Sequence, residues 1–144
     1  MPHRRLKEIV AGQDLLYVGP SATVREAADR MRERHVGAAL VIDEGVLRGI
    51  FTERDLLQRV VASGYDPETT FVAQVMSHDP HSLDGDRQGI EAMRIMREEG
   101  IQHVAVTGLA GIGYGVISMR DFLGTEVAAF EKEFEFEERV WQEV

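Results

Sequence analysis

An amphipathic helix is the first clear periodic feature of the chain. Val24, Ala27 and Met31 stand at i, i+3 and i+7, so they line one face of a helix. Thr23 and Glu26 have the spacing of a capping box at the start of this run. The pattern predicts a helix that begins after Thr23 and packs its apolar face against a core.

Two short apolar runs rich in β-branched residues follow at 38–43 and 46–51. The dipeptide Glu44-Gly45 separates them, and this spacing is typical of a tight β-hairpin. Beyond the hairpin the spacing becomes helical again, in a run formed by Leu56, Leu57, Val60 and Val61. One half of the chain therefore reads as a lead-in segment, a strand, a helix, two strands and a helix.

The same order of elements occurs twice. The run Gly-Ile-Phe-Thr-Glu-Arg-Asp-Leu at 49–56 is matched 66 residues later by Gly-Val-Ile-Ser-Met-Arg-Asp-Phe at 115–122. Upstream, residues 36–41 align with 101–106 within one residue of that spacing. The chain is therefore an internal duplication. Neither half buries its helices and sheet alone, so we expect two pseudo-symmetric α/β (α+β) units of β-α-β-β-α order packed through their sheets.

The duplication divides the chain into four parts. We assign a first repeat to 6–62, a polar linker to 63–71, a second repeat to 72–125 and an acidic helical tail to 126–144. The second repeat differs from the first in a predicted helix stop at Gly100 and in a longer hairpin loop at 108–113. That glycine-rich loop lies between two predicted strands, so it is not a dinucleotide-binding loop, which would open a helix.

Composition narrows the functional classes. The formal net charge of −9 disfavours nucleic acid as the main partner, since phosphate backbones are bound by clustered Lys and Arg. The chain has no run of about 18 apolar residues, so we expect no membrane span and a cytoplasmic location. There are no cysteines, which excludes thiolate chemistry. No serine lies in a nucleophile elbow, so we expect no enzymatic activity.

The repeated signature Gly-h-h-Thr/Ser-x-x-Asp, where h is apolar, resembles the cystathionine-β-synthase-type (CBS) repeat. Each copy follows a strand such as Val-Gly-Ala-Ala-Leu-Val-Ile-Asp at 36–43, and the resemblance covers residues 6–125. It implies a Bateman module, a non-catalytic homodimeric sensor that signals to an unknown regulated protein by conformational change. The implied ligands are AMP, ADP, ATP, S-adenosylmethionine or NAD-type molecules. The alternative is an assembly subunit that dimerises and recruits a partner without any ligand.

The resemblance also implies which residues contact a ligand. The family pattern puts the signature aspartate on the ribose hydroxyls and the Thr or Ser near the ribose and phosphate. The base is held by backbone and apolar side chains at the start of the first hairpin strand. The matching positions are Thr52, Asp55, Ser118 and Asp121 for the ribose and phosphate, and Val36, Ala38, Ile101, His103 and Val104 for the base. Family members often have proline where Ala105 stands, which leaves the strand geometry of the second site open.

Some of these residues also have a purely structural interpretation. A hydroxyl followed three residues later by a carboxylate resembles a capping box, and capping and ligand contact can coexist. Arg54 and Arg120 occupy the same signature position in the two repeats. Each either pairs with phosphate oxygens or is a solvated side chain. His78 and His81 lie where the family has no metal, so we expect no metal site.

The tail leaves two interpretations open. Its apolar residues fall near a seven-residue rhythm on an otherwise acidic helix, although Phe134-Glu135-Phe136 could also alternate as a strand. The apolar stripe either covers its own domain or docks onto a second subunit or a partner. It consists of Val127, Phe130, Phe134, Trp141 and Val144.

Overall fold

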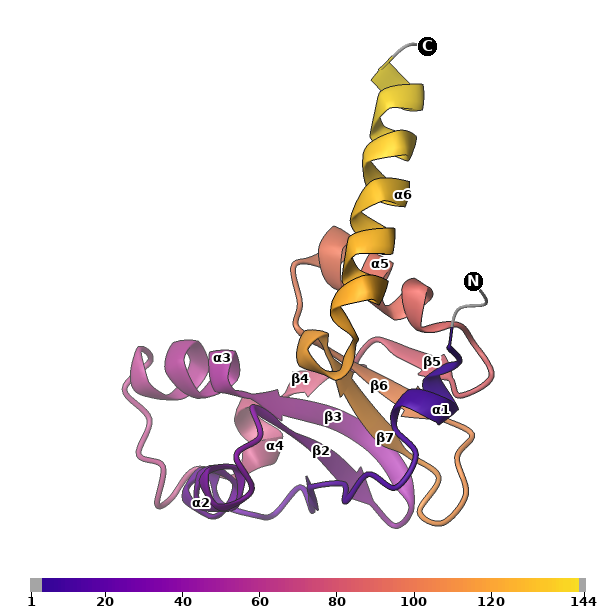
Figure 1. The fold of residues 1–144 in the computed structure, drawn as a ribbon. Helices are drawn as coiled ribbons and strands as arrows, with labels where there is room; N and C mark the ends of the chain where they lie inside the picture. The colour runs from indigo at the N-terminus through magenta and orange to yellow at the C-terminus, as the bar shows by residue number, and fades with distance from the viewer. Residues whose placement is uncertain (1–3, 143–144) are drawn as a thin grey trace. The chain divides into compact units, whose positions relative to one another are not determined.

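The computed structural model describes residues 4–142, which form two compact α/β units (Figure 1). One unit, the central unit, is the continuous segment 13–81. The other, the terminal unit, combines the described residues 4–12 with 82–142. The duplication predicted from the sequence is therefore realised as two units of mixed strands and helices.

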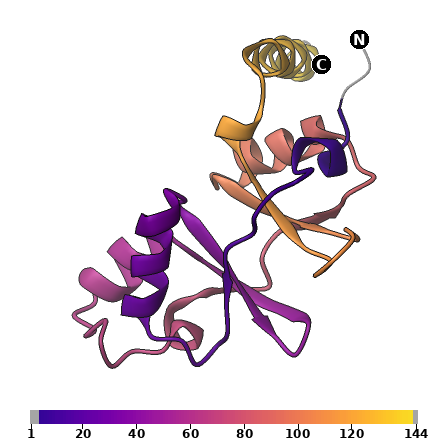
Figure 2. The same cartoon turned by 60° about the horizontal axis from the view of Figure 1, so that its bottom comes forward.

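The central unit is built on a four-stranded sheet in the order β1-β2-β3-β4. Strand β1 (Tyr17–Val18) is parallel to β2 (Ala38–Asp43), whereas β3 (Val46–Thr52) is antiparallel to both β2 and β4 (Ser77–His78). Its helical segments are α2 (Val24–Arg34), α3 (Glu53–Asp55), η1 (Leu56–Val61) and α4 (Val72–Val75). Figure 2 shows α2 beside the segment formed by α3 and η1, on one side of the β2–β3 hairpin.

The predicted local structure of the central unit is confirmed at α2 and at the hairpin. The backbone N–H of Glu26 donates to Thr23 Oγ1, and that of Thr23 donates to Glu26 Oε2, each over 3.1 Å, so the capping box is complete. Glu44 and Gly45 have φ values of 50° and 78°, the left-handed conformation that a tight two-residue hairpin requires. Val24, Ala27 and Met31 lie in the core beside Ala39, Val41 and Phe51.

The helix after the hairpin buries less than its sequence pattern predicted. The segment η1 has π-helical hydrogen bonding, and of its apolar residues Val60 is fully buried while Leu56 is half-buried. Leu57 and Val61 are 62% and 65% exposed. Of the four apolar residues in this segment, Leu56 and Val60 therefore face the core, and Leu57 and Val61 face outward.

The terminal unit has a three-stranded sheet in the order β5-β6-β7. Strand β5 (Ser82–Asp84) is parallel to β6 (His103–Thr107), which is antiparallel to β7 (Gly115–Ser118). Its helical segments are α1 (Leu6–Ile9), α5 (Gly89–Glu99), η2 (Met119–Asp121) and α6 (Gly124–Gln142). Gly100 ends α5 with a φ of 65°, as its position in the sequence predicted.

The lead-in helix of each repeat packs into the unit formed by the other repeat. Leu6 of α1 is fully buried in the core of the terminal unit, together with Val104 and Ile117. Val72 of α4 is fully buried in the core of the central unit. The compact units therefore cut across the repeats assigned from the sequence, because each apolar lead-in helix is buried in the core formed mainly by the other repeat.

The polar linker is an ordered part of the central unit. Backbone carbonyls of Pro67 and Thr70 accept hydrogen bonds from the N–H groups of Arg25 and Val24, in the first turn of α2. These N–H groups have no partner within the helix. The linker thus caps α2, which explains why Thr70 is buried despite its polar neighbours.

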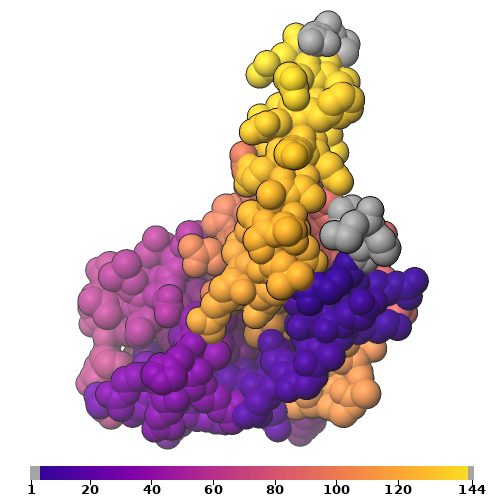
Figure 3. Space-filling view, viewed as in Figure 1, coloured from indigo at the N-terminus to yellow at the C-terminus, as the bar shows by residue number. Residues whose placement is uncertain are grey.

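The tail forms one continuous helix that begins at Gly124. Phe130 belongs to the buried core cluster of the terminal unit, and the half-buried Val127 and Phe134 pack against that cluster. Trp141, in contrast, is 79% exposed. Figure 3 shows the end of α6 extending beyond the rest of its unit. The first half of the tail stripe therefore covers its own domain, as one interpretation held. Trp141, in the second half, is exposed and remains available for the other interpretation, contact with a second subunit or a partner. Val144 lies outside the described residues.

No helix within residues 4–142 combines the length and apolarity needed to cross a membrane. This includes α6, in which charged side chains alternate with the apolar ones.

Candidate functional site

The signature of the first repeat forms a closed hydrogen-bonded turn between β3 and α3. The backbone N–H and the hydroxyl of Thr52 donate to Asp55 Oδ2 over 3.0 and 3.1 Å. In return, the backbone N–H of Asp55 donates to Thr52 Oγ1 over 3.2 Å. The two side chains that the sequence paired are therefore in direct contact, and each holds the other in place.

The other oxygen of Asp55 is held by residues that the sequence had not singled out. Ser77 on β4 donates its hydroxyl to Asp55 Oδ1 over 3.0 Å. Arg59 of η1 places its Nε 3.5 Å from the same oxygen and donates from Nη1 to the carbonyl of Met76 over 3.0 Å. Asp55 is only 5% exposed. Its carboxylate is thus buried inside its own unit.

The signature glycine of the first repeat allows this arrangement. A Cβ atom on Gly49 would lie 2.7 Å from the carbonyl oxygen of Ser77 and 2.6 Å from the sulfur of Met76. Such separations are too short for any side chain at this position. Glycine therefore lets β4 approach β3 closely, and the pairing of Ile50 with Ser77 brings the serine hydroxyl to Asp55.

The signature of the second repeat has the same turn but an open carboxylate. The backbone N–H and the hydroxyl of Ser118 donate to Asp121 Oδ2 over 2.8 and 3.3 Å. Asp121 is exposed, and its Oδ1 accepts no hydrogen bond from any residue in the described range 4–142. The turn continues only into the short helix η2, so the second site is less enclosed than the first.

The structure brings the predicted base-contacting residues to the same end of each hairpin as the signature. Ala38 pairs with Thr52 across β2 and β3, and His103 pairs with Ser118 across β6 and β7. Val36 and Ile101 are half-buried just before these strands. In each unit the start of the first hairpin strand therefore lies beside the signature turn.

Val104 and Ala38 differ from the other members of these clusters in burial. Val104 is 0% exposed and lies in the core of the terminal unit, so its side chain cannot reach a ligand. Ala38 is 3% exposed. These two positions can offer a ligand only backbone groups. The two signature arginines, Arg54 and Arg120, are both exposed beside the turns.

Metal-binding groupings do not occur in the described part of the chain. Among residues 4–142, no three His, Cys, Asp or Glu side chains lie close enough together to hold a metal ion. His78 and His81 are both exposed, at the end of β4 and just before β5.

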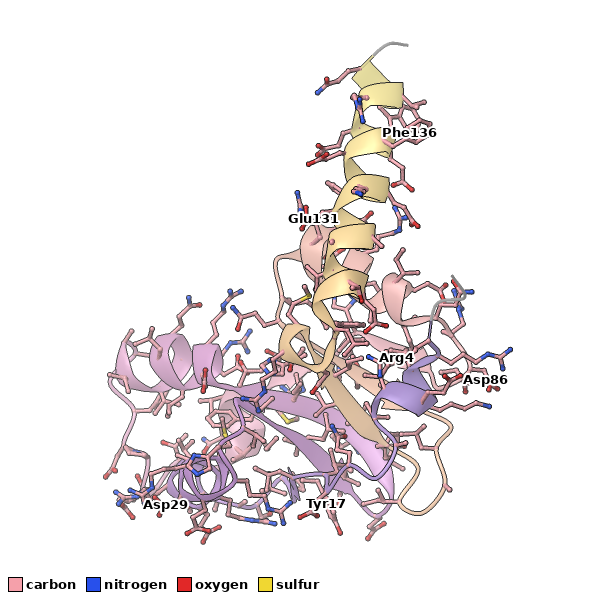
Figure 4. The ribbon with its side chains drawn as sticks, viewed as in Figure 1. Arg4, Tyr17, Asp29, Asp86, Glu131 and Phe136 are labelled. Carbon is pink, nitrogen blue, oxygen red and sulfur yellow. The ribbon has the colours of Figure 1, made fainter. Side chains whose placement is uncertain are left out.

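Ion pairs fix the acidic helix α6 to the rest of the terminal unit. Arg4 donates from Nε and Nη2 to the Glu126 carboxylate over 3.0 and 2.6 Å, and Arg94 donates from Nη1 and Nη2 to Glu137 over 2.5 and 2.9 Å. The Arg94 hydrogen bond lowers the pKa of Glu137, and Glu126 raises the pKa of Arg4. Figure 4 shows Arg4 near the base of α6 and Phe136 towards its far end.

The beginning and the end of α6 present different surfaces. Near the middle of the helix the guanidinium carbon of Arg97 lies 4.4 Å from the centroid of the Phe134 ring, a cation–π contact. Beyond this point three apolar side chains lie on the surface. They are Phe136, Val140 and Trp141, which are 63%, 45% and 79% exposed.

Comparison with known families identifies the class of protein that this fold defines. The family model of the CBS domain matches residues 6–62 and 72–127, which together make up most of the chain. The chain therefore belongs to the CBS-domain family, with two CBS domains in tandem. The resemblance found in the repeated signature is confirmed.

Two relatives match most of this chain, and one of them, CBSCBSPB1, is described as a CBS domain-containing protein. The protein MK0525 of Methanopyrus kandleri is 32% identical over 130 residues, which are 86% of this chain and 65% of that protein. CBSCBSPB1 of Arabidopsis thaliana is 40% identical over 105 residues, which are 73% of this chain and 19% of that protein. The chain thus spans less than two thirds of the length of these relatives.

Solved structures share the fold. The CBS-domain protein ATU1752 from Agrobacterium tumefaciens has a TM-score of 0.71 and 32% identity, covering 81% of this chain and 94% of that one. PAE2072 from Pyrobaculum aerophilum, a CBS-domain protein solved in complex with AMP, has a TM-score of 0.75 and 24% identity. Its match covers 89% of this chain and 98% of that one. The tandem CBS fold predicted from the sequence is confirmed.

Proposed function

We propose that this chain is a non-catalytic regulatory module that binds an adenosine nucleotide, AMP, ADP or ATP, at its CBS signature turns. The observation that carries the proposal is the open carboxylate of Asp121. It is held in place by Ser118 through one oxygen while the other oxygen has no partner among residues 4–142. A free carboxylate oxygen of this kind is suited to accept hydrogen bonds from the two hydroxyls of a ribose.

Neighbouring groups suit the remaining parts of a nucleotide. His103 pairs with Ser118 at the start of β6, where its imidazole and the half-buried Ile101 are placed to contact a base. Arg120 is exposed next to Asp121 and supplies a positive charge for a phosphate group. Val104 contributes through its backbone alone, since its side chain is buried in the core. The complex of PAE2072 with AMP shows that a protein of this fold accepts such a ligand.

The proposal is tested by comparing ligands that differ only in the ribose. Isothermal titration calorimetry is carried out on the intact chain with AMP and with 2′,3′-dideoxy-AMP. We expect AMP to bind at least tenfold more tightly, because each lost hydrogen bond to a charged group is worth about 1.5–3 kcal/mol. Equal affinity for the two ligands would show that no carboxylate contacts the ribose.

The exposed end of α6 favours a second candidate function, that of an assembly subunit. Phe136 and Trp141 expose large apolar surfaces on a helix end that contacts little of its own unit, and such surfaces are typical of protein contacts. In this function the chain self-associates or recruits a partner without a nucleotide. Sedimentation of the intact chain and of the double variant F136S/W141S, both without nucleotide, tests it. Assembly through this helix end predicts a smaller species for the variant, and an unchanged mass contradicts it.

A further inference from the structure

The two signature carboxylates have different partners. Asp55 accepts from Thr52 through Oδ2 and from Ser77 through Oδ1, with the Arg59 Nε 3.5 Å away. Among residues 4–142, Asp121 accepts only from Ser118, through Oδ2. A carboxylate offers about four acceptor positions in all. Asp55 has therefore used most of its capacity within its own unit, whereas half of the capacity of Asp121 is unused.

The sequence explains why Asp55 and Asp121 have different partners. The repeats are offset by 66 residues at the signature, so the counterpart of Ser77 in the terminal unit is Ala11 and the counterpart of Arg59 is Thr125. Alanine has no donor, and threonine cannot supply the charge of a guanidinium. The groups that occupy Asp55 are therefore missing from the second repeat.

The two sheets also differ at the strand that carries the signature turn. In the central unit β4 pairs with the outer edge of β3 and carries Ser77 to the carboxylate. In the terminal unit the chain after α1 forms a turn, and no strand among the described residues pairs with the outer edge of β7. Nothing in the terminal unit therefore takes the place that β4 takes beside Asp55.

We propose that the chain binds a single nucleotide, at Ser118 and Asp121, and that Ser77 and Arg59 act as an internal substitute for a ligand at Asp55. A ribose at Asp55 would have to displace the serine hydroxyl from a carboxylate that is only 5% exposed. At Asp121 the ribose could bind to Oδ1, which accepts no hydrogen bond from residues 4–142. This inference rests on the proposed function and specifies which of its two sites is used.

The test counts the ligands bound to each chain. Calorimetry with AMP, supported by native mass spectrometry, is carried out on the wild-type chain and on D121N, D55N and the double variant S77A/R59T. The double variant gives the first site the residues of the second. We expect one AMP per chain for the wild type and for D55N, at least tenfold weaker binding for D121N, and two AMP per chain for S77A/R59T.

Two further variants keep the result interpretable. S77A alone removes one donor and leaves Arg59 attached to the carbonyl of Met76, so it applies if the double variant does not fold. S63A is the matched control, because Ser63 is an exposed serine that bonds only to the backbone of Gln58. We expect a second, weaker AMP for S77A and one AMP for S63A.

Failure of this inference is distinguishable from failure of the proposed function. Two AMP molecules on the wild-type chain, or one AMP that D121N leaves at full affinity, would overturn the single-site assignment while nucleotide binding stands. A second site that appears in neither S77A nor S77A/R59T would overturn the role of Ser77 and Arg59. If no chain in the series binds AMP, ADP or ATP at millimolar concentration, the proposed function itself is wrong.

Discussion

At the scale of single residues, the same signature aspartate has two physical roles. Asp55 is buried and holds β3, β4 and η1 together through Thr52, Ser77 and Arg59. Asp121 is exposed and closes only its own turn with Ser118. Identical positions in a duplicated sequence therefore differ in what they contribute to stability, because the surrounding donors differ.

We predict that Asp55→Ala destabilises the protein and that Asp121→Ala does not. Removing the Asp55 carboxylate leaves the Ser77 and Thr52 donors without a buried partner, a cost of about 1–3 kcal/mol. Asp121→Ala, the matched control, removes an exposed side chain and should change stability by less than about 0.5 kcal/mol. Urea unfolding of both variants measures the difference. Equal stabilities would contradict the burial of the Asp55 network.

At the scale of elements, α6 is anchored at its beginning and exposed at its end. Phe130 is 2% exposed and contacts Phe134, with ring centroids 5.8 Å apart, within the core of the terminal unit. Phe136, six residues along the helix from Phe130, is 63% exposed. The apolar anchoring of the helix therefore lies in its first three turns, and Glu137 adds an ion pair with Arg94 beyond them.

Alanine substitutions should reveal this gradient. We expect Phe130→Ala to lower the free energy of unfolding by about 3–5 kcal/mol, the usual cost of truncating a buried phenylalanine. Phe136→Ala should change it by less than about 0.5 kcal/mol. Chemical denaturation followed by circular dichroism provides both values. A large loss for Phe136→Ala would mean that the end of α6 is packed against something in solution.

Acid should release the outer part of α6. The hydrogen bond from Arg94 lowers the pKa of Glu137 from its ordinary value of 4.5, so the stabilising ion pair is fully present above pH 4.5 and is lost as the pH falls through the lowered pKa. Trp141, the only tryptophan, lies one turn further along the helix and reports on the order there. Its fluorescence anisotropy should stay constant from pH 8 to pH 5 and decrease below pH 4.5.

Charge-neutral variants separate this ion pair from general acid effects. Glu137→Gln should show the low anisotropy already at neutral pH, because Arg94 then loses its charged partner. Glu138→Gln, the adjacent exposed residue, should behave like the wild type. A transition centred above pH 6, or an identical response of both variants, would rule out the Arg94–Glu137 pair as the cause.

At the scale of the whole molecule, the chain is organised by units that interleave the two repeats. The first repeat supplies α1 to the terminal unit and the second supplies α4 to the central unit. A substitution in one repeat can therefore destabilise the unit formed mainly by the other repeat.

Amide hydrogen exchange tests whether each lead-in helix stabilises the unit in which it is buried. We expect Leu6→Ala to increase exchange in β6 and α5 of the terminal unit and to leave β2 of the central unit protected, because Leu6 is fully buried in the terminal core. Val72→Ala should show the opposite pattern, with β2 and α2 affected. If Leu6→Ala exposed the central unit instead, the assignment of α1 to the terminal unit would be wrong.

Much of this architecture could be predicted from the sequence. Period and spacing predicted α2, the Glu44-Gly45 hairpin and the helix stop at Gly100, because each depends on neighbouring residues. The capping-box spacing predicted that Thr52 would meet Asp55 and that Ser118 would meet Asp121. All of these are local consequences of residue type.

Long-range partners could not be predicted in the same way. Ser77 lies 22 positions from Asp55 and carries no motif, so only the pairing of β4 with β3 reveals that it reaches the carboxylate. The burial of α1 in the terminal unit depends on which sheet face is open, and the exposure of Leu57 depends on how η1 sits on its core. The sequence did contain one signal. At the repeat spacing, Ser77 is equivalent to Ala11 and Arg59 is equivalent to Thr125, so the two repeats differ at both positions.

The central claim, that this CBS-domain chain senses an adenosine nucleotide, is tested most directly by thermal unfolding with AMP, ADP, ATP, NAD and S-adenosylmethionine. A ligand that binds only the native state at a hundred times its dissociation constant stabilises it by about 2.7 kcal/mol. The account predicts a rise in Tm of several degrees with at least one adenosine nucleotide and a clearly smaller rise for Asp121→Asn at the same ligand concentration. No rise with any of the five at millimolar concentration would contradict it and favour assembly through the end of α6.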